Sequence, residues 1–196
     1  MASPAPSRMT SLHPEDWIRA AQTHLAGQGI ESVRVEVLAR DLGVSKGSFY
    51  WHFRDRNDLL EKLLARWEDG ELQWLNAEAG TEAATRWARF IERTSEPERM
   101  RLEIALRAWA RGDERVAGRV VEIETRKERL IAGVLHDIGF TQSAADSGAE
   151  VISLICLGWL DRATRAKHLP LANTGLRDLL SDFILAASAR SPVTGH

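Results

Sequence analysis

Apolar residues recur at every third or fourth position along most of the chain, and this spacing restricts the fold more than any other feature. It places apolar side chains on one face of an α-helix. No stretch shows the sustained alternation of apolar and polar residues, bounded by turn residues, that is typical of a β-strand. The sequence therefore predicts an all-α fold.

Three short helices are expected between residues 14 and 56. They follow residues 1–13, which lack periodicity and are expected to form a disordered arm. The first helix opens at Pro14, because the fixed φ of proline suits the first helical position. The second ends at a glycine, and Ser45 is a typical N-cap for a third helix that continues through Phe53.

The third of these helices is expected to bury one face and to leave the other in solvent. With 100° per residue, Phe49 and Phe53 fall on the same side. The residues on the opposite half are Gly47, Ser48, Tyr50 and Trp51. Exposed aromatic residues usually mark a contact site, and the nearby Lys46 adds a positive charge. This arrangement is typical of a helix-turn-helix whose last helix enters the major groove of DNA.

The distribution of charge along the chain is compatible with DNA binding, but it does not by itself require DNA binding. The net charge is −2, but residues 1–56 hold seven Lys/Arg against six Asp/Glu, and residues 57–196 hold nineteen against twenty-two. Basic residues that fall close together in the first segment are Arg34, Arg40, Lys46, Arg54 and Arg56. They form either a phosphate-facing patch or part of an ordinary mixed surface.

Val37–Phe53, followed by Asp58-Leu59-Leu60, resembles the N-terminal domain of the TetR/AcrR regulators. The similarity covers roughly residues 14–60. It implies a homodimer that binds a palindromic operator in double-stranded DNA, and a divergent C-terminal domain with a ligand cavity. The residues that it assigns to DNA binding are Arg34, Ser45, Lys46, Gly47, Ser48, Tyr50, Trp51, His52 and Arg56.

Residues 57–196 are expected to form a second helical domain for ligand binding and dimerisation. Val151–Leu160 is apolar except at Ser153 and Gly158, so a helix there must be covered on more than one side. A leucine-rich stripe follows at residues 176–187. Two such helices from each of two subunits would form a four-helix interface. A core helix within one subunit explains the same pattern.

Helix boundaries in this second domain are suggested by capping residues. Ser95-x-x-Glu98 has the pattern of a capping box, which predicts a helix start at Ser95. Another helix, with a highly charged middle, is expected to begin after Asp113 and to end at Gly139.

Five of the seven tryptophans lie in this second domain. We expect Trp67, Trp87 and Trp109 to contact a flat apolar ligand, although ordinary core packing is the favoured explanation for any one of them taken singly. The charged residues beside these tryptophans are Arg86, Glu103 and Arg107. They supply polar groups to a ligand or lie in solvent.

Other classes of site have little support. Cys156 is the only cysteine, so an intramolecular disulfide and a cysteine-built zinc site are excluded. The six histidines include no pair at helical spacing, and no phosphate-binding loop, dinucleotide fingerprint or nucleophile elbow is present. We therefore expect no metal, no cofactor, no catalytic residues and no enzymatic activity.

No apolar run approaches the length of a membrane span, so a cytoplasmic protein is expected. The resemblance to the TetR/AcrR regulators implies that this protein is a repressor. It would bind operator DNA and be released by an unidentified small-molecule inducer. Two alternatives remain open at this stage. One is a transcriptional activator, and the other is an all-α binding module or enzyme with an incidental helix-turn-helix.

Overall fold

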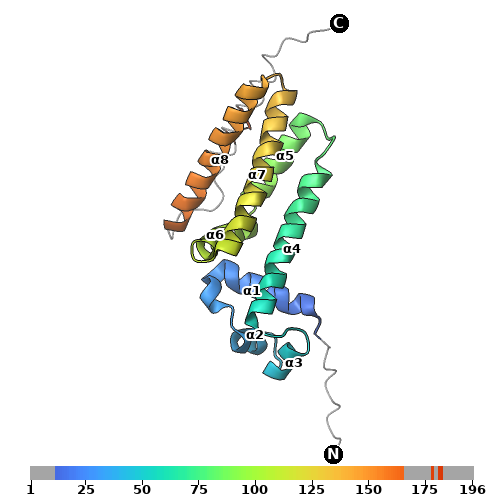
Figure 1. The fold of residues 1–196 in the computed structure, drawn as a ribbon, viewed down its shortest axis with the longest axis vertical. Coiled ribbons are helices and arrows are strands. Elements are labelled where there is room, and N and C mark those ends of the chain that lie inside the picture. The colour runs from blue at the N-terminus through green and yellow to red at the C-terminus, as the bar shows by residue number, and fades with distance from the viewer. Residues whose placement is uncertain (1–11, 166–177, 179–180, 183–196) are drawn as a thin grey trace, which may run out of the picture. The chain divides into compact units, whose positions relative to one another are not determined.

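The computed structural model describes residues 12–165, 178 and 181–182 (Figure 1). The described residues form α-helices, one 3₁₀ turn and no strand, which confirms the predicted all-α fold. They divide into two compact units, with the division between Ala65 and Arg66. Nearly all of the predicted arm, and most of the stripe at residues 176–187, lie outside the described residues.

Unit 1 contains three short helices and the first part of a fourth. They are α1 (Pro14–Gln28), α2 (Val35–Asp41), α3 (Lys46–Tyr50) and α4 (Arg56–Ala77), with the 3₁₀ turn η1 (Ile30–Ser32) after α1. Trp17 packs edge-on against Phe49 with 5.3 Å between ring centroids, and both side chains are fully buried. Phe53 stacks on Phe49 at 5.2 Å, which confirms their predicted common face.

The helix α3 ends at Tyr50, three residues earlier than predicted. The amides of His52 and Phe53 both donate to the Phe49 carbonyl, so the chain leaves the helix in a tight turn. It then enters α4 through a cap in which the amide of Asp58 donates to the Asp55 carboxylate at 2.8 Å. Ser45 occupies the predicted N-cap position of α3, but its side chain makes no capping hydrogen bond.

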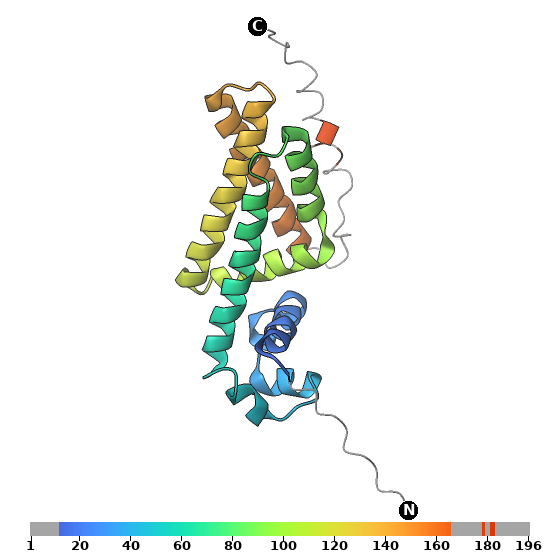
Figure 2. The same ribbon diagram turned by 90° about the vertical axis from the view of Figure 1, so that its right-hand side faces the viewer.

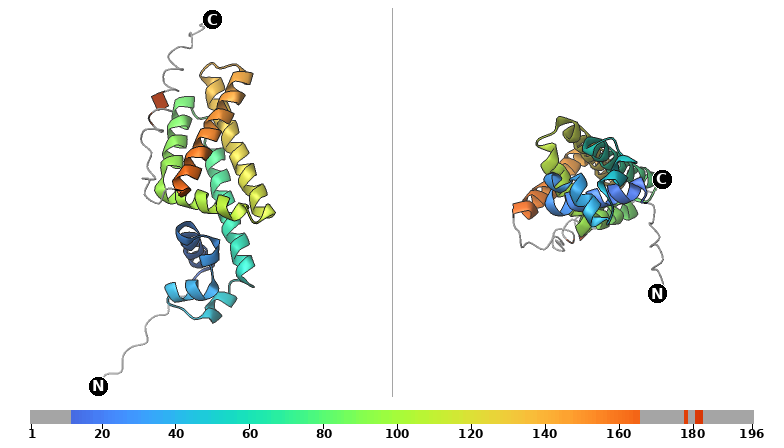
Figure 3. Two further views of the ribbon diagram at one scale, coloured as in Figure 1. Left: turned by 90° about the vertical axis from the view of Figure 1, so that its left-hand side faces the viewer. Right: turned by 90° about the horizontal axis from the view of Figure 1, so that it is seen from below.

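Unit 2 contains the rest of α4 and four further helices. These are α5 (Ala83–Ser95), α6 (Pro97–Ala110), α7 (Glu114–Asp137) and α8 (Gln142–Arg165). The helix α7 packs against α5, α6 and α8. Figures 2 and 3 show α6 running at a steep angle to α5 and α7, across one end of the bundle that they form.

One predicted helix start in unit 2 is confirmed and one is wrong. The helix α7 begins at Glu114, directly after Asp113 as predicted, and the Asp113 side chain accepts hydrogen bonds from two backbone amides at its start. Ser95, in contrast, is the last residue of α5, and α6 starts at Pro97 after an N-cap at Glu96. Proline is favoured at the first helical position because it has no amide hydrogen to leave unpaired, and it places the start two residues later.

The core of unit 2 joins α5, α7 and α8. Its members include Trp87 and Phe90, whose rings stack at 5.7 Å, together with Ile131 and Val134. The helices α7 and α8 approach closely at Gly148, where an added Cβ would lie 2.8 Å from Leu135 Cδ1. No helix among the described residues is long and apolar enough to cross a membrane.

Candidate functional site

The outer face of α3 is aromatic and exposed. Trp51 is 87% exposed and Tyr50 is 62% exposed, whereas the neighbouring Phe49 is fully buried. Exposure of two large aromatic side chains beside a packed one is unfavourable in water unless something else covers them. Gly47 is also exposed, and a Cβ there would meet only Ser45 Oγ at 3.5 Å, so packing within unit 1 does not require glycine.

Lys46, at the start of α3, is paired with a carboxylate from α2. Its Nζ lies 2.7 Å from Glu36 Oε1, and both side chains are more than half exposed. The hydrogen bond from Lys46 lowers the pKa of Glu36, so the pair stays charged at neutral pH. Exposed ion pairs contribute little to stability, and Lys46 can therefore exchange Glu36 for another anion at small cost.

Other members of the predicted DNA-binding set differ in exposure. Ser45 and Arg34 are exposed, and Arg34 is the N-cap of α2. Ser48 and His52 are half-buried. The structure brings all of them, with Lys46, Gly47, Tyr50 and Trp51, into unit 1 on α2, α3 and the turns beside them.

Arg56 departs from the predicted arrangement. Its Nε donates to the Val33 carbonyl at 2.6 Å and its Nη2 to the Ile30 carbonyl at 2.7 Å. The guanidinium is therefore directed to the backbone between η1 and α2 instead of an open surface. Arg56 holds that connection in place, a role that its position at the start of α4 did not reveal.

A cavity of about 230 Å³ lies within unit 2. Residues of α4, α5, α6, α7 and α8 line it. Part of its wall is apolar, with Phe90, Met100, Leu157, Trp159 and Leu160 among the lining residues. The rest of the wall is charged. A small amphipathic molecule is the kind of ligand that such a mixed cavity accommodates.

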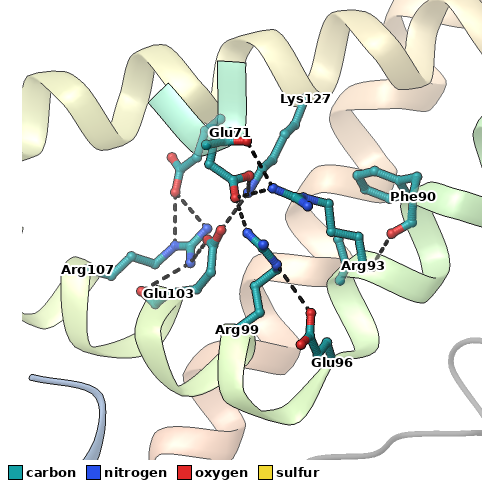
Figure 4. Close-up of polar contacts among 11 residues, drawn as sticks. Glu71, Phe90, Arg93, Glu96, Arg99, Glu103, Arg107 and Lys127 are labelled. Carbon is teal, nitrogen blue, oxygen red and sulfur yellow. Dashed lines mark hydrogen bonds and ion pairs between the residues drawn. The ribbon is translucent and has the colours of Figure 1, made fainter. Parts of the chain in front are cut away.

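Glu71 does not line the cavity itself, but it pairs with three cations of the charged wall (Figure 4). This α4 carboxylate is almost completely buried, and Arg93 of α5 donates to it at 2.9 Å. Arg99 of α6 also donates to the same oxygen, and Lys127 Nζ of α7 lies 3.0 Å from the other oxygen. One carboxylate thus joins four helices through three cations.

Glu103 extends the same network along α6 (Figure 4). Its carboxylate accepts hydrogen bonds from Lys127 at 2.5 Å and from Arg107 at 2.8 Å, and Arg107 also donates to Glu124 at 2.9 Å. Burial alone would raise the pKa of Glu103, but the charges and hydrogen bonds of Lys127 and Arg107 outweigh it and lower the pKa to about 2. Glu103 is therefore an anion at neutral pH.

Two alternatives were open for Arg86, Glu103 and Arg107, namely contact with a ligand and exposure to solvent. Glu103 and Arg107 line the cavity, so they are not simply solvated. Arg86 is outside the lining set and pairs with Asp137 at the end of α7. Sequence reasoning missed Glu71 and Lys127 because their significance depends on which helices meet.

The three tryptophans expected to contact a ligand are not among the residues that line this cavity. Trp87 is packed in the core of unit 2, Trp67 is buried, and Trp109 is half-buried. The tryptophans that do line it are Trp74 and Trp159. The indole of Trp74 is covered by the Arg93 guanidinium, 4.6 Å from the ring centroid.

The helix α8 has a buried face and an exposed apolar face. Ile152 is buried, whereas Val151 and Leu154 are 54% and 60% exposed. The residues that the structure describes therefore leave one apolar face of this helix exposed. Cys156 lies on the cavity side, where burial raises the pKa of its thiol to about 11. No group of three possible metal ligands occurs among the described residues.

Comparison with known proteins gives sequence matches in the N-terminal part of the chain. Residues 18–63 match the model of "Bacterial regulatory proteins, tetR family". The chain is 42% identical over 55 residues to the class A tetracycline repressor from transposon 1721 of Escherichia coli. It is 39% identical over 44 residues to the regulator AcrR of Shigella flexneri. These matches span 28% and 22% of this chain, and 26% and 19% of the relatives' own lengths.

Solved structures with a similar fold extend over most of the chain. A transcriptional regulator from Saccharomonospora viridis in complex with choline has a TM-score of 0.73 and 21% identity, with 88% of this chain and 95% of that one covered. FadR of Bacillus subtilis in complex with stearoyl-CoA has a TM-score of 0.56 and 16% identity, with 89% and 99% covered. At these identities the likeness concerns the fold. Residues 18–63 are therefore similar to the N-terminal domain of the tetR family of bacterial regulatory proteins.

Proposed function

We propose that this protein is a repressor that binds palindromic operator DNA as a homodimer and is released by a small molecule. The observation that carries the proposal is the face of α3, where Tyr50 and Trp51 are exposed beside the buried Phe49. A major-groove helix needs such an outward set, since hydroxyl, indole and backbone groups there meet phosphates and base edges.

Lys46 is the residue most suited to a phosphate contact. It is exposed at the start of α3, and its present partner Glu36 is exposed as well. A DNA phosphate would replace Glu36 as the anion. Ser45, Gly47, Ser48, Tyr50, Trp51, His52 and Arg34 are proposed to complete the surface. Arg56 is proposed to support it from within unit 1, because its donors are engaged by Val33 and Ile30.

The first test is a salt titration of DNA binding by Lys46→Ala. An operator is first selected from random duplexes, and its affinity is then measured by fluorescence anisotropy at several salt concentrations. Loss of one phosphate contact should weaken binding to all sequences and reduce the salt slope by about 1. Arg19→Ala is the matched control, because Arg19 is also an exposed cation paired with a carboxylate, on α1.

Two results would count against this role for Lys46. An unchanged salt slope would remove it from the phosphate contacts. A loss confined to the selected operator would show that Lys46 contacts a base. If the wild-type protein selects no sequence at all, the whole proposal fails.

The proposed dimer uses the exposed face of α8. Val151 and Leu154 lie on this face, and burying them against a second copy would remove apolar surface from water. Leu154→Glu should therefore give a monomer in sedimentation equilibrium and should weaken operator binding. Charged substitution of Leu157 is a poorer test, because Leu157 lines the cavity. A Leu154→Glu protein that stays dimeric would place the interface elsewhere.

The cavity of unit 2 is the proposed inducer site. Its support is the mixed apolar and charged lining, together with two structures of similar fold that were solved with small molecules bound. A ligand can release DNA only if it prefers a conformation with lower operator affinity. Reciprocity then requires that operator DNA weaken ligand binding by the same factor.

A further inference from the structure

The charges around the cavity are already balanced without a ligand. Four cations line it, and they are Arg93, Arg99, Arg107 and Lys127. Each is paired with at least one of Glu71, Glu103 and Glu124, and Arg99 has Glu96 as a further partner. An anionic ligand would have to compete with carboxylates that are held in the protein. The cationic part of the wall is therefore a poor receptor for an anion.

Glu128 differs from every other charged residue of the lining. It lies on α7, one turn after Glu124, and it is half-buried. The described part of the structure gives it no hydrogen-bond or ion-pair partner, although all the other charged lining residues have one. A partly buried carboxylate without a partner gains most from a cation that is brought to it.

Trp159 provides a second element for the same ligand. It lines the cavity from α8, and its indole has no ring or cation contact among the described residues. Trp74 is different, because the Arg93 guanidinium already covers its ring. An indole face attracts cations through the charge distribution of its ring. A carboxylate and an unoccupied indole in one cavity are suited to an organic cation.

We propose that this cavity selects a small organic monocation whose positive group lies near Glu128 and whose apolar part contacts Trp159 and Leu160. The inference rests on the proposed role of the cavity as an inducer site, and it adds the chemical class of the inducer. The cavity volume of about 230 Å³ lies at the small end of ligand pockets and favours a compact molecule.

The experiment compares three probes of nearly equal size and different charge. They are 2-phenylethylammonium, the neutral 2-phenylethanol and the anionic phenylacetate. Binding to the full-length protein without DNA is measured by isothermal titration calorimetry at pH 7. The cation should bind about tenfold more tightly than the alcohol, which corresponds to about 1.4 kcal/mol. Phenylacetate should bind least.

Variants assign the preference to named residues. Glu128→Gln should reduce the affinity for the cation to that for the alcohol and leave the alcohol unchanged. Glu114→Gln is the matched control, because Glu114 is an exposed carboxylate on the same helix that does not line the cavity. Trp159→Leu should also weaken the cation more than the alcohol, and it serves as a second variant if Glu128→Gln does not fold.

Three results would overturn the inference. They are a preference for phenylacetate, equal binding of all three probes, and a preference for the cation that persists in both Glu128→Gln and Trp159→Leu. None of them concerns DNA, since the titration contains none, so the repressor proposal is judged by operator binding alone. Conversely, a protein that prefers the cation but selects no operator would retain this inference and lose the proposed function.

Discussion

Replacement of Glu103 by glutamine is expected to destabilise unit 2 strongly at neutral pH and much less in acid. The carboxylate holds Lys127 and Arg107, and its pKa is lowered from the ordinary 4.5 to about 2. Each pKa unit corresponds to about 1.4 kcal/mol, so the ionised form contributes about 3 kcal/mol to the free energy of unfolding at pH 7. Removing one partner of a buried ion pair typically costs about 3–5 kcal/mol, which agrees.

The pH dependence of this effect has a definite sign. Because the pKa of Glu103 is lower in the folded protein than in the unfolded one, its contribution is complete above about pH 4.5 and is lost as the pH falls towards 2. The difference between wild type and Glu103→Gln should therefore shrink from about 3 kcal/mol at pH 7 to about 1 kcal/mol at pH 3.

Urea denaturation, followed by far-ultraviolet circular dichroism at both pH values, measures this difference. Glu122→Gln is the control, because Glu122 pairs with Arg126 on the surface of α7, with both side chains about half exposed. It should change the free energy of unfolding only slightly. A Glu103→Gln protein as stable as wild type at pH 7, or equally destabilised at pH 3, would refute the reasoning.

Two further predictions concern the arginine of α4 and the thiol of the cavity. Arg56→Ala should lower the free energy of unfolding of unit 1 by about 1–3 kcal/mol, because the carbonyls of Val33 and Ile30 lose their donors. Hydrogen exchange measures this, and a variant of unchanged stability with a reduced DNA salt slope would make Arg56 a phosphate contact instead. Cys156, with a pKa of about 11 in place of 9.0, should react with a thiol reagent at pH 8 about 100-fold more slowly than in urea, and equal rates would show that it is not buried.

Local sequence signals predicted unit 1 well because they act over a few residues. Pro14 fixed the start of α1, and the i, i+4 spacing of Phe49 and Phe53 gave the buried face of α3. The end of α3 was missed, since it depends on how the chain caps α4 through Asp55 and Asp58. The spacing of apolar residues alone does not show where α3 ends and the cap of α4 begins.

The cavity could not be predicted to the same degree. Tryptophan was a reasonable indicator of a ligand site. The sequence does not distinguish Trp87 from Trp159, however, and the structure packs Trp87 in the core of unit 2 while Trp159 lines the cavity. The network around Glu71 joins residues that are up to 56 positions apart, from Glu71 to Lys127. Only the packing of α4, α5, α6 and α7 decides which charges meet, and no short-range pattern contains that information.

The exposure of Trp51 also gives the protein an optical property. All seven tryptophans fall within residues 12–165, and Trp51 is the only one whose side chain is exposed, at 87%. A collisional quencher such as iodide should therefore act chiefly on this indole, and the emission that it removes should lie at the long-wavelength edge of the spectrum. The outer face of α3 thus carries its own fluorescent label, so its contacts can be followed without attaching a dye.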